Sequence, residues 1–247
     1  MSQPPTSILG ATLLASVGGG ETLASVVAQR LAEAISMGLI ADGEQLPPES
    51  ELAAQLAIST VSLRAALAIL RQEGVLETRR GRSGGSFIRA PSDYSPSKSI
   101  QRLGNMSPSQ VRDLGYELEA ITGVAASLAA QRFDGDNIAR LKGLAEQLAE
   151  AGAPLERLRL YSRFHIEIAV ASQSERLTRR MVVLQAEYSE LLWLPAAGVD
   201  HVSSAQRHIE LVKAIEAGDA ELARRLAEAY VTDNTRRIVE LRLGMDE

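Results

Sequence analysis

Residues 43–88 constrain the fold more than any other part of this 247-residue chain. They predict a short helix that begins after Pro48, with glutamates in its first turn, where acidic side chains favour the positive end of the helix dipole. After a tight turn around Ala57, Ser59 can cap a second helix, whose leucines recur at helical spacing until Gly74 ends it. Two short strands joined by a glycine-rich turn follow. This order predicts a winged helix-turn-helix.

Such a motif binds DNA through the N-terminal residues of its second helix, which enter the major groove. Serine and threonine hydroxyls can bind bases or phosphates, and arginine prefers guanine or phosphate. The hairpin adds arginines beside glycines, whose slim backbone can approach phosphates or the minor groove closely. The residues expected to contact DNA are Ser59, Thr60, Ser62 and Arg64 in the helix and Arg79, Arg80, Gly81 and Arg82 in the hairpin.

The segment resembles the DNA-binding domain of GntR-type bacterial transcription regulators over residues 21–90. It carries G-x-x-LP-x-E-x-x-LA, a serine-led recognition helix with V/L-R-x-A-L-x-x-L, and E-G-V/L before a basic, glycine-rich wing. The resemblance implies major-groove contacts from the start of the recognition helix and minor-groove contacts from the wing tip. The residues implicated are Ser59, Ser62, Arg64, Arg80, Gly81 and Arg82. Thr60 and Ser50 stand where relatives often carry arginine, so the operator sequence does not transfer from a relative.

Composition fits a DNA-binding protein only locally. The chain has no cysteine, no apolar stretch of about 20 residues that would span a bilayer, and no basic residue before Arg30, so a cytoplasmic location is expected. The formal net charge is −5, but the distribution of charge matters more for DNA binding than its total. Between Ser59 and Arg89, six arginines oppose two glutamates, and this basic segment fits a DNA-binding surface.

The chain divides into four expected segments. Residues 1–20 are predicted to be a flexible arm, 21–90 the DNA-binding domain, and the Ser- and Pro-rich residues 91–107 a linker. Residues 108–242 have the helical spacing of an all-α antiparallel bundle of about six helices. The expected helices lie near 22–37, 108–132, 134–151, 154–172, 174–193, 204–217 and 219–242. The predicted fold class is mainly α, with three helices and a β-hairpin in the N-terminal domain.

The helical half resembles the FCD domain, the ligand-sensing part of the FadR subfamily of GntR regulators. The segments that carry this resemblance are DLGYELEAITGVAASLAAQR (113–132), YSRFHIEIAVAS (161–172) and RHIELVKAIEAGDAELARRLAEAYV (207–231). The resemblance implies a small-molecule effector, a homodimer on a palindromic double-stranded DNA operator, and repression more often than activation. A dimer also has a physical motive, because one helix-turn-helix buries too little surface for tight specific binding.

FCD domains commonly hold a divalent metal through one aspartate and three histidines. Here His165 and His208 match the second and third positions, whereas Tyr161 and Tyr230 occupy the first and fourth. Neutral imidazole suits zinc, nickel or manganese, but a phenol, with a pKa of about 10, is a weak ligand near neutral pH. We therefore expect no tightly held metal. We expect instead a pocket of these four residues that binds a small ligand through hydrogen bonds.

Other interpretations stay open for these residues. Asp200 or His201, from the loop over 194–204, could complete a different metal site with the two histidines. The arginine that often faces the effector in relatives falls near Leu118 or Glu119, and neither can replace it, which favours a less charged ligand.

Buried tyrosines can also simply fill a core, with the hydroxyl bonded to a backbone carbonyl, and a histidine on a helix is usually a packed or surface residue. The wing arginines could form a solvated turn, and those of the last helix are most simply a solvated face. Trp193 could pack in the core or cover a subunit contact.

An enzyme is not expected, because the chain has no cysteine nucleophile, G-x-S-x-G motif, phosphate-binding loop or H-E-x-x-H motif. Two alternatives to an effector-controlled regulator remain. One is a DNA-binding protein whose helical half is a protein-interaction module. The other is a metal-dependent helical-bundle enzyme, which would be two metal ligands short.

Overall fold

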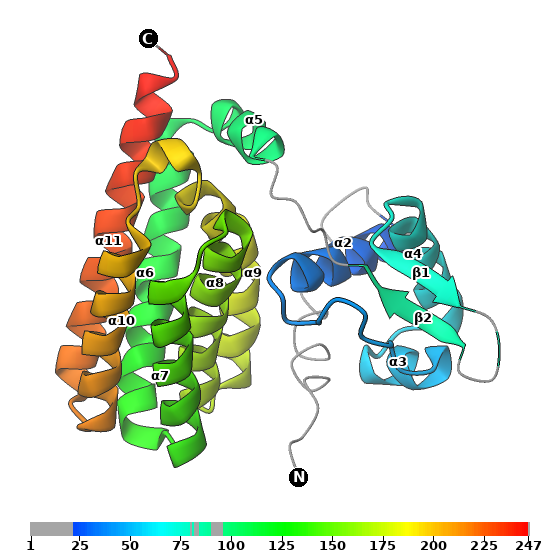
Figure 1. Ribbon diagram of the computed structural model, residues 1–247, viewed down its shortest axis with the longest axis horizontal. Helices are drawn as coiled ribbons and strands as arrows, with labels where there is room; N and C mark the ends of the chain where they lie inside the picture. Colours follow the sequence, from blue (N-terminus) through cyan, green and yellow to red (C-terminus); the bar gives the residue numbers. More distant parts are fainter. Residues whose placement is uncertain (1–21, 80, 82–83, 90–95, 247) are drawn as a thin grey trace. The chain divides into compact units, whose positions relative to one another are not determined.

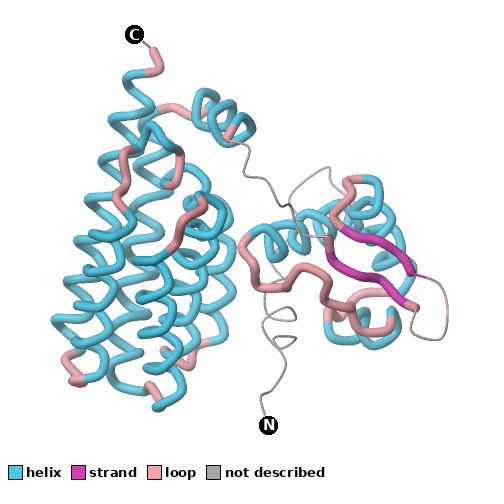
Figure 2. Tube along the Cα trace, in the orientation of Figure 1, coloured by secondary structure: helices cyan, strands magenta, loops and turns pink. Residues whose placement is uncertain are grey.

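Two structural units make up the chain in this computed structural model, Met1–Ser92 and Asp93–Glu247. The structure describes residues 22–79, 81, 84–89 and 96–246. Among these described residues, three helices accompany a two-stranded sheet in the first unit, and the second unit consists of helices and the loops between them (Figure 1 and Figure 2). The predicted fold class is confirmed.

The described helices of the first unit are α2 (Leu23–Ser36), α3 (Glu49–Gln55) and α4 (Thr60–Gln72). Helices α3 and α4 meet at 105°, an angle typical of a helix-turn-helix. In the turn between them Ala57 adopts a left-handed φ of 51°. The apolar side chains of all three helices share one core, because spacings of three and four residues place them on one side of each helix. The core leucines Leu31, Leu52, Leu56, Leu63, Leu67 and Leu70 are at most 1% exposed.

The hairpin consists of β1 (Leu76–Arg79) and β2 (Gly85–Ile88), which pair antiparallel with Leu76 opposite Ile88. As predicted, Gly74 follows the end of α4, and it does so with a φ of 75°. Between the strands Gly81 has a φ of 118°, a conformation that residues with side chains rarely adopt. The hairpin therefore needs glycine at this position of the wing.

The bundle of the second unit contains six long α-helices among the described residues (Figure 1). Their bounds are α6 (Pro108–Arg132), α7 (Gly135–Glu150), α8 (Pro154–Ala171), α9 (Glu175–Leu192), α10 (His201–Glu216) and α11 (Ala220–Gly244). Capping boxes at Ser107 and Asp134 start α6 and α7, because each side chain accepts a hydrogen bond from an otherwise unpaired backbone N–H. Helix α10 begins at His201 rather than near 204, because Asp200 caps it.

Helices α6 and α11 pack closely along their lengths (Figure 1). Gly115 permits this approach, since a Cβ atom there would lie 2.3 Å from Cγ2 of Thr235. Helix α11 contacts α10 as well, and α8 contacts α6, α7 and α9. Side chains of α8, α10 and α11 can therefore meet inside the bundle.

A further helix, α5 (Ser97–Asn105), lies inside the range predicted to be a linker. Its Leu103 is fully buried, and the hydroxyl of Ser99 donates a hydrogen bond of 3.1 Å to Oε2 of Glu190 on α9. Residues 97–105 of the predicted linker range are therefore helical in the structure. Only two buried side chains attach this short helix to the bundle. Two such residues are too few to indicate a helix within a Ser- and Pro-rich segment of sequence.

None of the helices in the described part of the chain is by itself long and apolar enough to span a membrane. Helices α3 and α4 meet the criteria of length and composition only when taken together, across their bend.

Candidate functional site

The start of α4 presents an exposed polar surface. Ser59 is the N-cap, as predicted, and its Oγ accepts a hydrogen bond of 3.0 Å from the backbone N–H of Ser62. Its hydroxyl also lies 2.9 Å from the Ser62 hydroxyl. Thr60 and Arg64 are exposed on the same end of the helix. The four helix residues predicted to contact DNA therefore lie together at the end of α4 that a helix-turn-helix presents to base edges.

Arg64 is held by an acidic neighbour from α3. Its Nε lies 2.6 Å from Oε2 of Glu49, while 69% of the arginine side chain is exposed. The glutamate therefore orients the guanidinium and offsets part of its charge. Because this contact joins two helices, helical spacing within α4 could not indicate it.

Val61 is a feature of this surface that sequence reasoning missed. It is 73% exposed, although valine is apolar, and it lies between Thr60 and Ser62. An apolar side chain at this position can contact the methyl group of thymine in the major groove. The sequence could have indicated this contact, because Val61 is an apolar residue at the second position of a capped recognition helix.

The described arginines of the hairpin and of α4 are largely engaged within the unit. The Arg79 guanidinium lies over the ring of Phe87, 4.4 Å from its centroid, and forms an ion pair with Glu77. Arg71, at the end of α4, donates hydrogen bonds to the hydroxyls of Thr78 (2.9 Å) and Ser86 (3.3 Å), and so ties the recognition helix to both strands. Arg71 thus stabilises the wing.

Two of the predicted contacts, Arg80 and Arg82, lie outside the described residues. Gly81 lies between them and is exposed.

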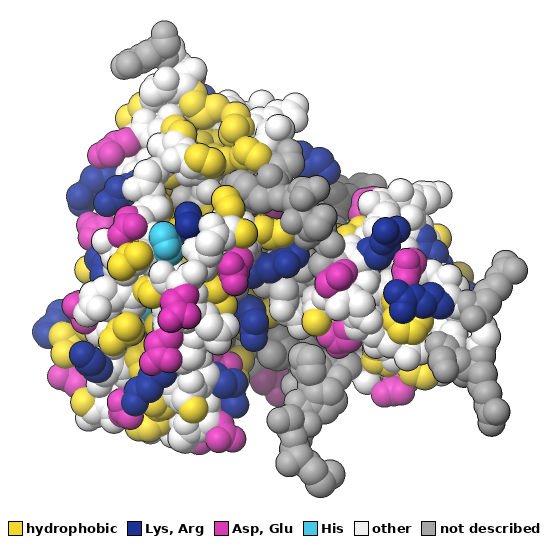
Figure 3. Space-filling view, in the orientation of Figure 1, with side chains coloured by type: hydrophobic (Ala, Val, Ile, Leu, Met, Phe, Trp, Pro, Cys, Tyr) yellow, Lys and Arg dark blue, Asp and Glu magenta, His cyan; other side chains and the backbone are white. Residues whose placement is uncertain are grey.

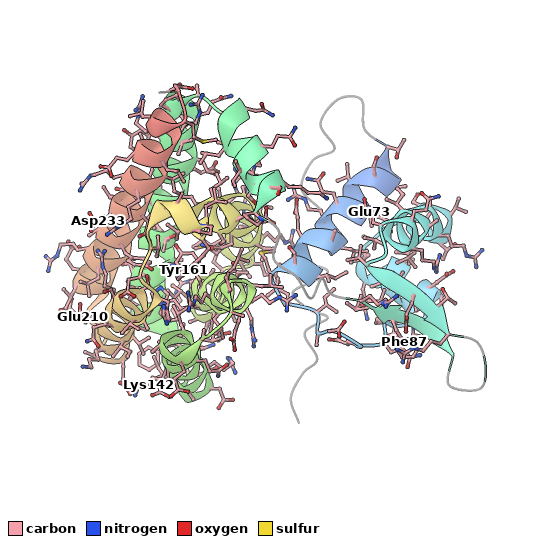
Figure 4. All side chains as sticks on the ribbon, turned by 45° about the horizontal axis from the view of Figure 1, so that its top comes forward. Glu73, Phe87, Lys142, Tyr161, Glu210 and Asp233 are labelled. Atoms are coloured by element: carbon pink, nitrogen blue, oxygen red, sulfur yellow. The ribbon has the colours of Figure 1, made fainter. Side chains whose placement is uncertain are left out.

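Inside the second unit four ring-bearing side chains from three helices meet. Tyr161 and His165 come from α8, His208 from α10 and Tyr230 from α11, and Figure 4 shows Tyr161 within the bundle. The ring centroids are 4.5 Å apart for Tyr161 and His165, 5.3 Å for the two histidines, and 5.2 Å for His208 and Tyr230. All four residues are at most 3% exposed. The structure therefore brings together the four residues predicted to form a pocket, here called the Tyr/His cluster.

The Tyr/His cluster is buried without the hydrogen bonds that usually accompany burial. Within the described part of the chain, both nitrogens of His165 and of His208 lack hydrogen-bond partners, and so do the hydroxyls of Tyr161 and Tyr230. Tyr188, an equally buried tyrosine of α9, bonds to Thr235 Oγ1 at 3.0 Å and to the Val231 carbonyl at 3.4 Å. Buried polar atoms are normally paired, so six unpaired atoms in one cluster indicate a site for a ligand or water.

Packing around the cluster holds its rings in place. Phe164 stacks on His208 with ring centroids 3.8 Å apart. Trp193 is 6% exposed, and its ring lies 5.9 Å from that of Tyr161, so it packs in the core of this unit.

Burial favours the neutral form of every group in the cluster. Removal from water lowers the pKa of His165 to about 3, and it lowers the pKa of His208 well below its usual value, with smaller effects of His165 and Arg207. Burial likewise raises the pKa of Tyr161 and of Tyr230, and the Asn234 side chain partly opposes both shifts. Asn234 approaches both hydroxyls, but not in the geometry of a hydrogen bond. Neutral imidazoles and phenols can each donate and accept a hydrogen bond.

This donor set does not fit the divalent metal that the FCD resemblance implies. Two neutral imidazoles could bind a metal, but the phenols resist the ionisation that would make them ligands. Across the described ranges, no group of three or more His, Asp or Glu side chains could hold a metal ion, so neither Asp200 nor His201 completes a site with the two histidines. Asp200 instead caps α10.

A small cavity of about 90 Å³ adjoins the cluster, with Tyr230 in its wall. Residues of the loop before α10 and of helices α10 and α11 line it, among them Arg207, Asn234 and Arg237. Sequence reasoning assigned the arginines of the last helix to a solvated face and did not connect Arg237 with the cluster. The sequence could have indicated this connection, because Arg237 follows Tyr230 by seven residues, which is two turns along the same face of α11.

Comparison with known proteins assigns each of the two units to a known domain family. The family model described as bacterial regulatory proteins of the gntR family matches residues 23–85, and the FCD domain model matches residues 118–233. The HTH-type transcriptional regulator RmpR of Mycobacterium gastri is 37% identical over 225 residues, which cover 89% of this chain and 81% of the relative. The L-lactate dehydrogenase operon regulatory protein of Escherichia coli is 31% identical over 224 residues, covering 85% and 84%.

The structure of a GntR-family transcriptional regulator from Pseudomonas syringae is similar in fold, with a TM-score of 0.52 at 18% identity over 98% of this chain and 95% of that one. These families and relatives are transcription regulators and not enzymes. The chain therefore belongs to the GntR family and is a DNA-binding transcriptional regulator, with an N-terminal GntR helix-turn-helix domain and a C-terminal FCD domain of the kind that binds small-molecule effectors.

Proposed function

We propose that this regulator binds its effector in the Tyr/His cluster, directly and without a metal, and that binding changes the affinity of the GntR domain for its operator. The observation that carries the proposal is the set of six unpaired polar atoms on four buried rings. Burying one unpaired polar group costs about 1–3 kcal/mol, so a ligand that supplied the missing hydrogen bonds would be bound strongly for its size. A helical module without a ligand would gain nothing from this arrangement.

We assign the chain further to the FadR subfamily and expect it to act as a repressor. Residues 21–90 serve as the DNA-binding domain, and residues 108–242 serve as the effector-binding and dimerisation domain. A homodimer is supported by an apolar stripe on α6, where Tyr116 (62% exposed) and Val124 (41% exposed) share one face. A second copy would cover this stripe, and the two GntR domains would bind a palindromic operator.

The path from effector to DNA would pass through α5, which lies between the two domains in the sequence and packs on α9. Helix α9 is also joined to α8 beside the cluster, because the hydroxyl of Ser162 donates to that of Ser189 at 2.9 Å. An effector that bound one arrangement of these helices more tightly than the other would shift the population of operator-binding dimers.

The DNA contacts are tested first. Operators would be selected from fragmented genomic DNA with the unmodified protein and should contain two related half-sites about one helical turn apart. We expect that Arg64→Ala and Arg82→Ala weaken operator binding and that Arg30→Ala, a change on α2, does not. Unchanged binding in both of the first two variants would refute the proposed docking of α4 and the wing.

The effector site is tested on the same operator. A cell extract or metabolite library that releases the unmodified protein from DNA should release Tyr161→Phe and His208→Ala more weakly. The control is Tyr188→Phe, which removes a buried hydroxyl that already has partners. Release that is equal in all four proteins would refute the Tyr/His cluster as the effector site, and transcription from the operator with and without effector would decide between repression and activation.

A further inference from the structure

Val61 is the most exposed large apolar side chain in the part of the chain that the structure describes, with 73% of its surface exposed. Core packing therefore does not explain this residue. Helix formation does not explain it either, because a β-branched side chain is a poorer helix former than alanine. On the visible face of the GntR domain apolar side chains lie among basic and acidic ones, so exposure alone assigns no role to Val61 (Figure 3). Its position on α4 does.

Val61 lies in the first turn of the recognition helix. Thr60 is exposed beside it, and the exposed Arg64 follows it by three residues, so Val61 and Arg64 lie on one side of α4. A helix-turn-helix presents the residues of this turn to base edges in the major groove. Because the side chain of valine has no charge and no polar atom, it cannot bind a phosphate group. The surface that Val61 can recognise is therefore the edge of a base.

The polar neighbours of Val61 have a limited capacity to bind bases. The Ser59 hydroxyl accepts the capping hydrogen bond from the backbone N–H of Ser62 at 3.0 Å and shares a second hydrogen bond with the Ser62 hydroxyl at 2.9 Å. The second bond uses one of the two hydroxyl hydrogens, so the pair keeps one free donor. Arg64 is paired with Glu49 at 2.6 Å. This turn therefore offers few hydrogen bonds for discrimination between base pairs, and an apolar contact would contribute a large share of the specificity.

One group in the major groove is complementary to a valine side chain. The base pairs present hydrogen-bond donors and acceptors there, and the C5-methyl group of thymine is the apolar exception. Against a polar base edge, valine would displace water without replacing its hydrogen bonds, which is unfavourable. Against the methyl group of thymine both surfaces are apolar, so their burial is favourable. The chemistry of Val61 therefore favours thymine over the other three bases.

We propose that Val61 is a specificity-determining residue, which selects thymine at one position of each operator half-site through contact between its methyl groups and the C5-methyl group of the base. In a homodimer the two copies of Val61 select thymines that are related by the two-fold axis of the operator. The inference rests on the proposed docking of α4 in the major groove and adds the base that one residue of this helix selects.

Uracil provides the test, because it pairs with adenine as thymine does and differs from thymine only in lacking the C5-methyl group. Operators selected with the unmodified full-length protein would be synthesised with uracil in place of one thymine at a time, at symmetry-related positions of both half-sites. Binding would be measured by fluorescence anisotropy at fixed salt. We expect one position at which uracil weakens binding about fourfold per half-site, the factor for burial of one methyl group, and so about 15-fold for the two half-sites.

Val61→Ala should abolish the difference between the thymine and uracil operators, because the side chain loses the methyl groups that make the contact. Val61→Thr, which has nearly the same shape and keeps one methyl group, should retain part of the difference. The control is Val202→Ala, which shortens an exposed valine at the start of α10, outside the GntR domain. Val61→Ala should not lower the unfolding midpoint of the GntR domain, measured by circular dichroism, since the side chain is exposed and alanine is the better helix former.

Two results would overturn the inference. One is the absence of a uracil effect at every thymine of the operator. The other is a uracil effect of equal size in the unmodified protein and in Val61→Ala, because the methyl group would then act through the shape of the DNA or through another residue.

Arg64→Ala separates these failures from failure of the proposed docking. If Arg64→Ala weakens binding and its dependence on salt while the uracil effect persists in Val61→Ala, then α4 docks in the groove but Val61 does not select thymine. If Arg64→Ala, Arg82→Ala and Val61→Ala all leave binding unchanged, the docking itself is refuted, and the inference with it.

Discussion

Two tyrosines buried to the same degree should respond oppositely to loss of the hydroxyl group. Tyr161 and Tyr188 are both fully buried in the FCD domain. The Tyr188 hydroxyl has two partners, at 3.0 and 3.4 Å, whereas that of Tyr161 has none in hydrogen-bond geometry among the residues that the structure describes. Phenylalanine at either position keeps the ring, so the comparison isolates the hydroxyl.

For Tyr188→Phe the lost hydrogen bonds leave Thr235 with an unpaired hydroxyl, and we expect a decrease of about 1–2 kcal/mol in the free energy of unfolding. For Tyr161→Phe the buried, unpaired hydroxyl disappears, and with it a desolvation penalty of about 1–3 kcal/mol. We therefore expect Tyr161→Phe to be neutral or about 1 kcal/mol more stable in the absence of ligand. The two variants should therefore differ by about 1–3 kcal/mol in the free energy of unfolding.

Urea unfolding followed by tryptophan fluorescence provides the assay, because the single tryptophan lies in the FCD domain and reports on that domain alone. With effector present the difference in stability between the two variants should become smaller, since Tyr161→Phe would lose a ligand contact and Tyr188→Phe would not. Equal destabilisation of both variants without ligand would refute the reasoning, because it would mean that the Tyr161 hydroxyl is already satisfied.

Three further outcomes are expected. Glu49→Gln releases Arg64 from its 2.6 Å contact and should tighten operator binding by up to about fivefold at fixed salt, measured by fluorescence anisotropy; weaker binding would mean that the glutamate is needed to orient the arginine. Ser59→Ala removes the N-cap of α4 and should lower the stability of the GntR domain by about 1 kcal/mol, measured by circular dichroism, and an unchanged midpoint would argue against the cap. Lowering the pH from 7 to 5 should decrease the free energy of unfolding of the FCD domain by about 2 kcal/mol through His165 alone, because its pKa is about 3 when folded and about 6.5 when unfolded, so that the unfolded chain binds a proton that the folded one does not. His208 acts in the same direction, and urea unfolding that was independent of pH over this range would contradict both assignments.

Much of the fold could be predicted because its signals are local. The start of α4 was predicted from the cap at Ser59, and the start of α6 at Pro108 is likewise set by a cap, at Ser107; each cap acts within one turn of its own helix. Leucine spacing likewise indicated the buried face of α4, because one helical turn relates the residues concerned. Helix α5 could not be predicted, since its position depends on a contact with α9, about 90 residues away in the sequence.

By itself the sequence determined the two domains, the exposed start of the recognition helix, and the four residues of the Tyr/His cluster, which a family pattern identified at helical spacing. Only the tertiary structure decided which polar atoms are paired. It showed that Tyr188 is satisfied and Tyr161 is not, that Glu49 restrains Arg64, and that Arg237 lines a cavity beside Tyr230. The physical reason is that a hydrogen bond or ion pair between helices depends on their packing to within a few tenths of an ångström, and the spacing of residues along one helix carries no information about the side chains of another.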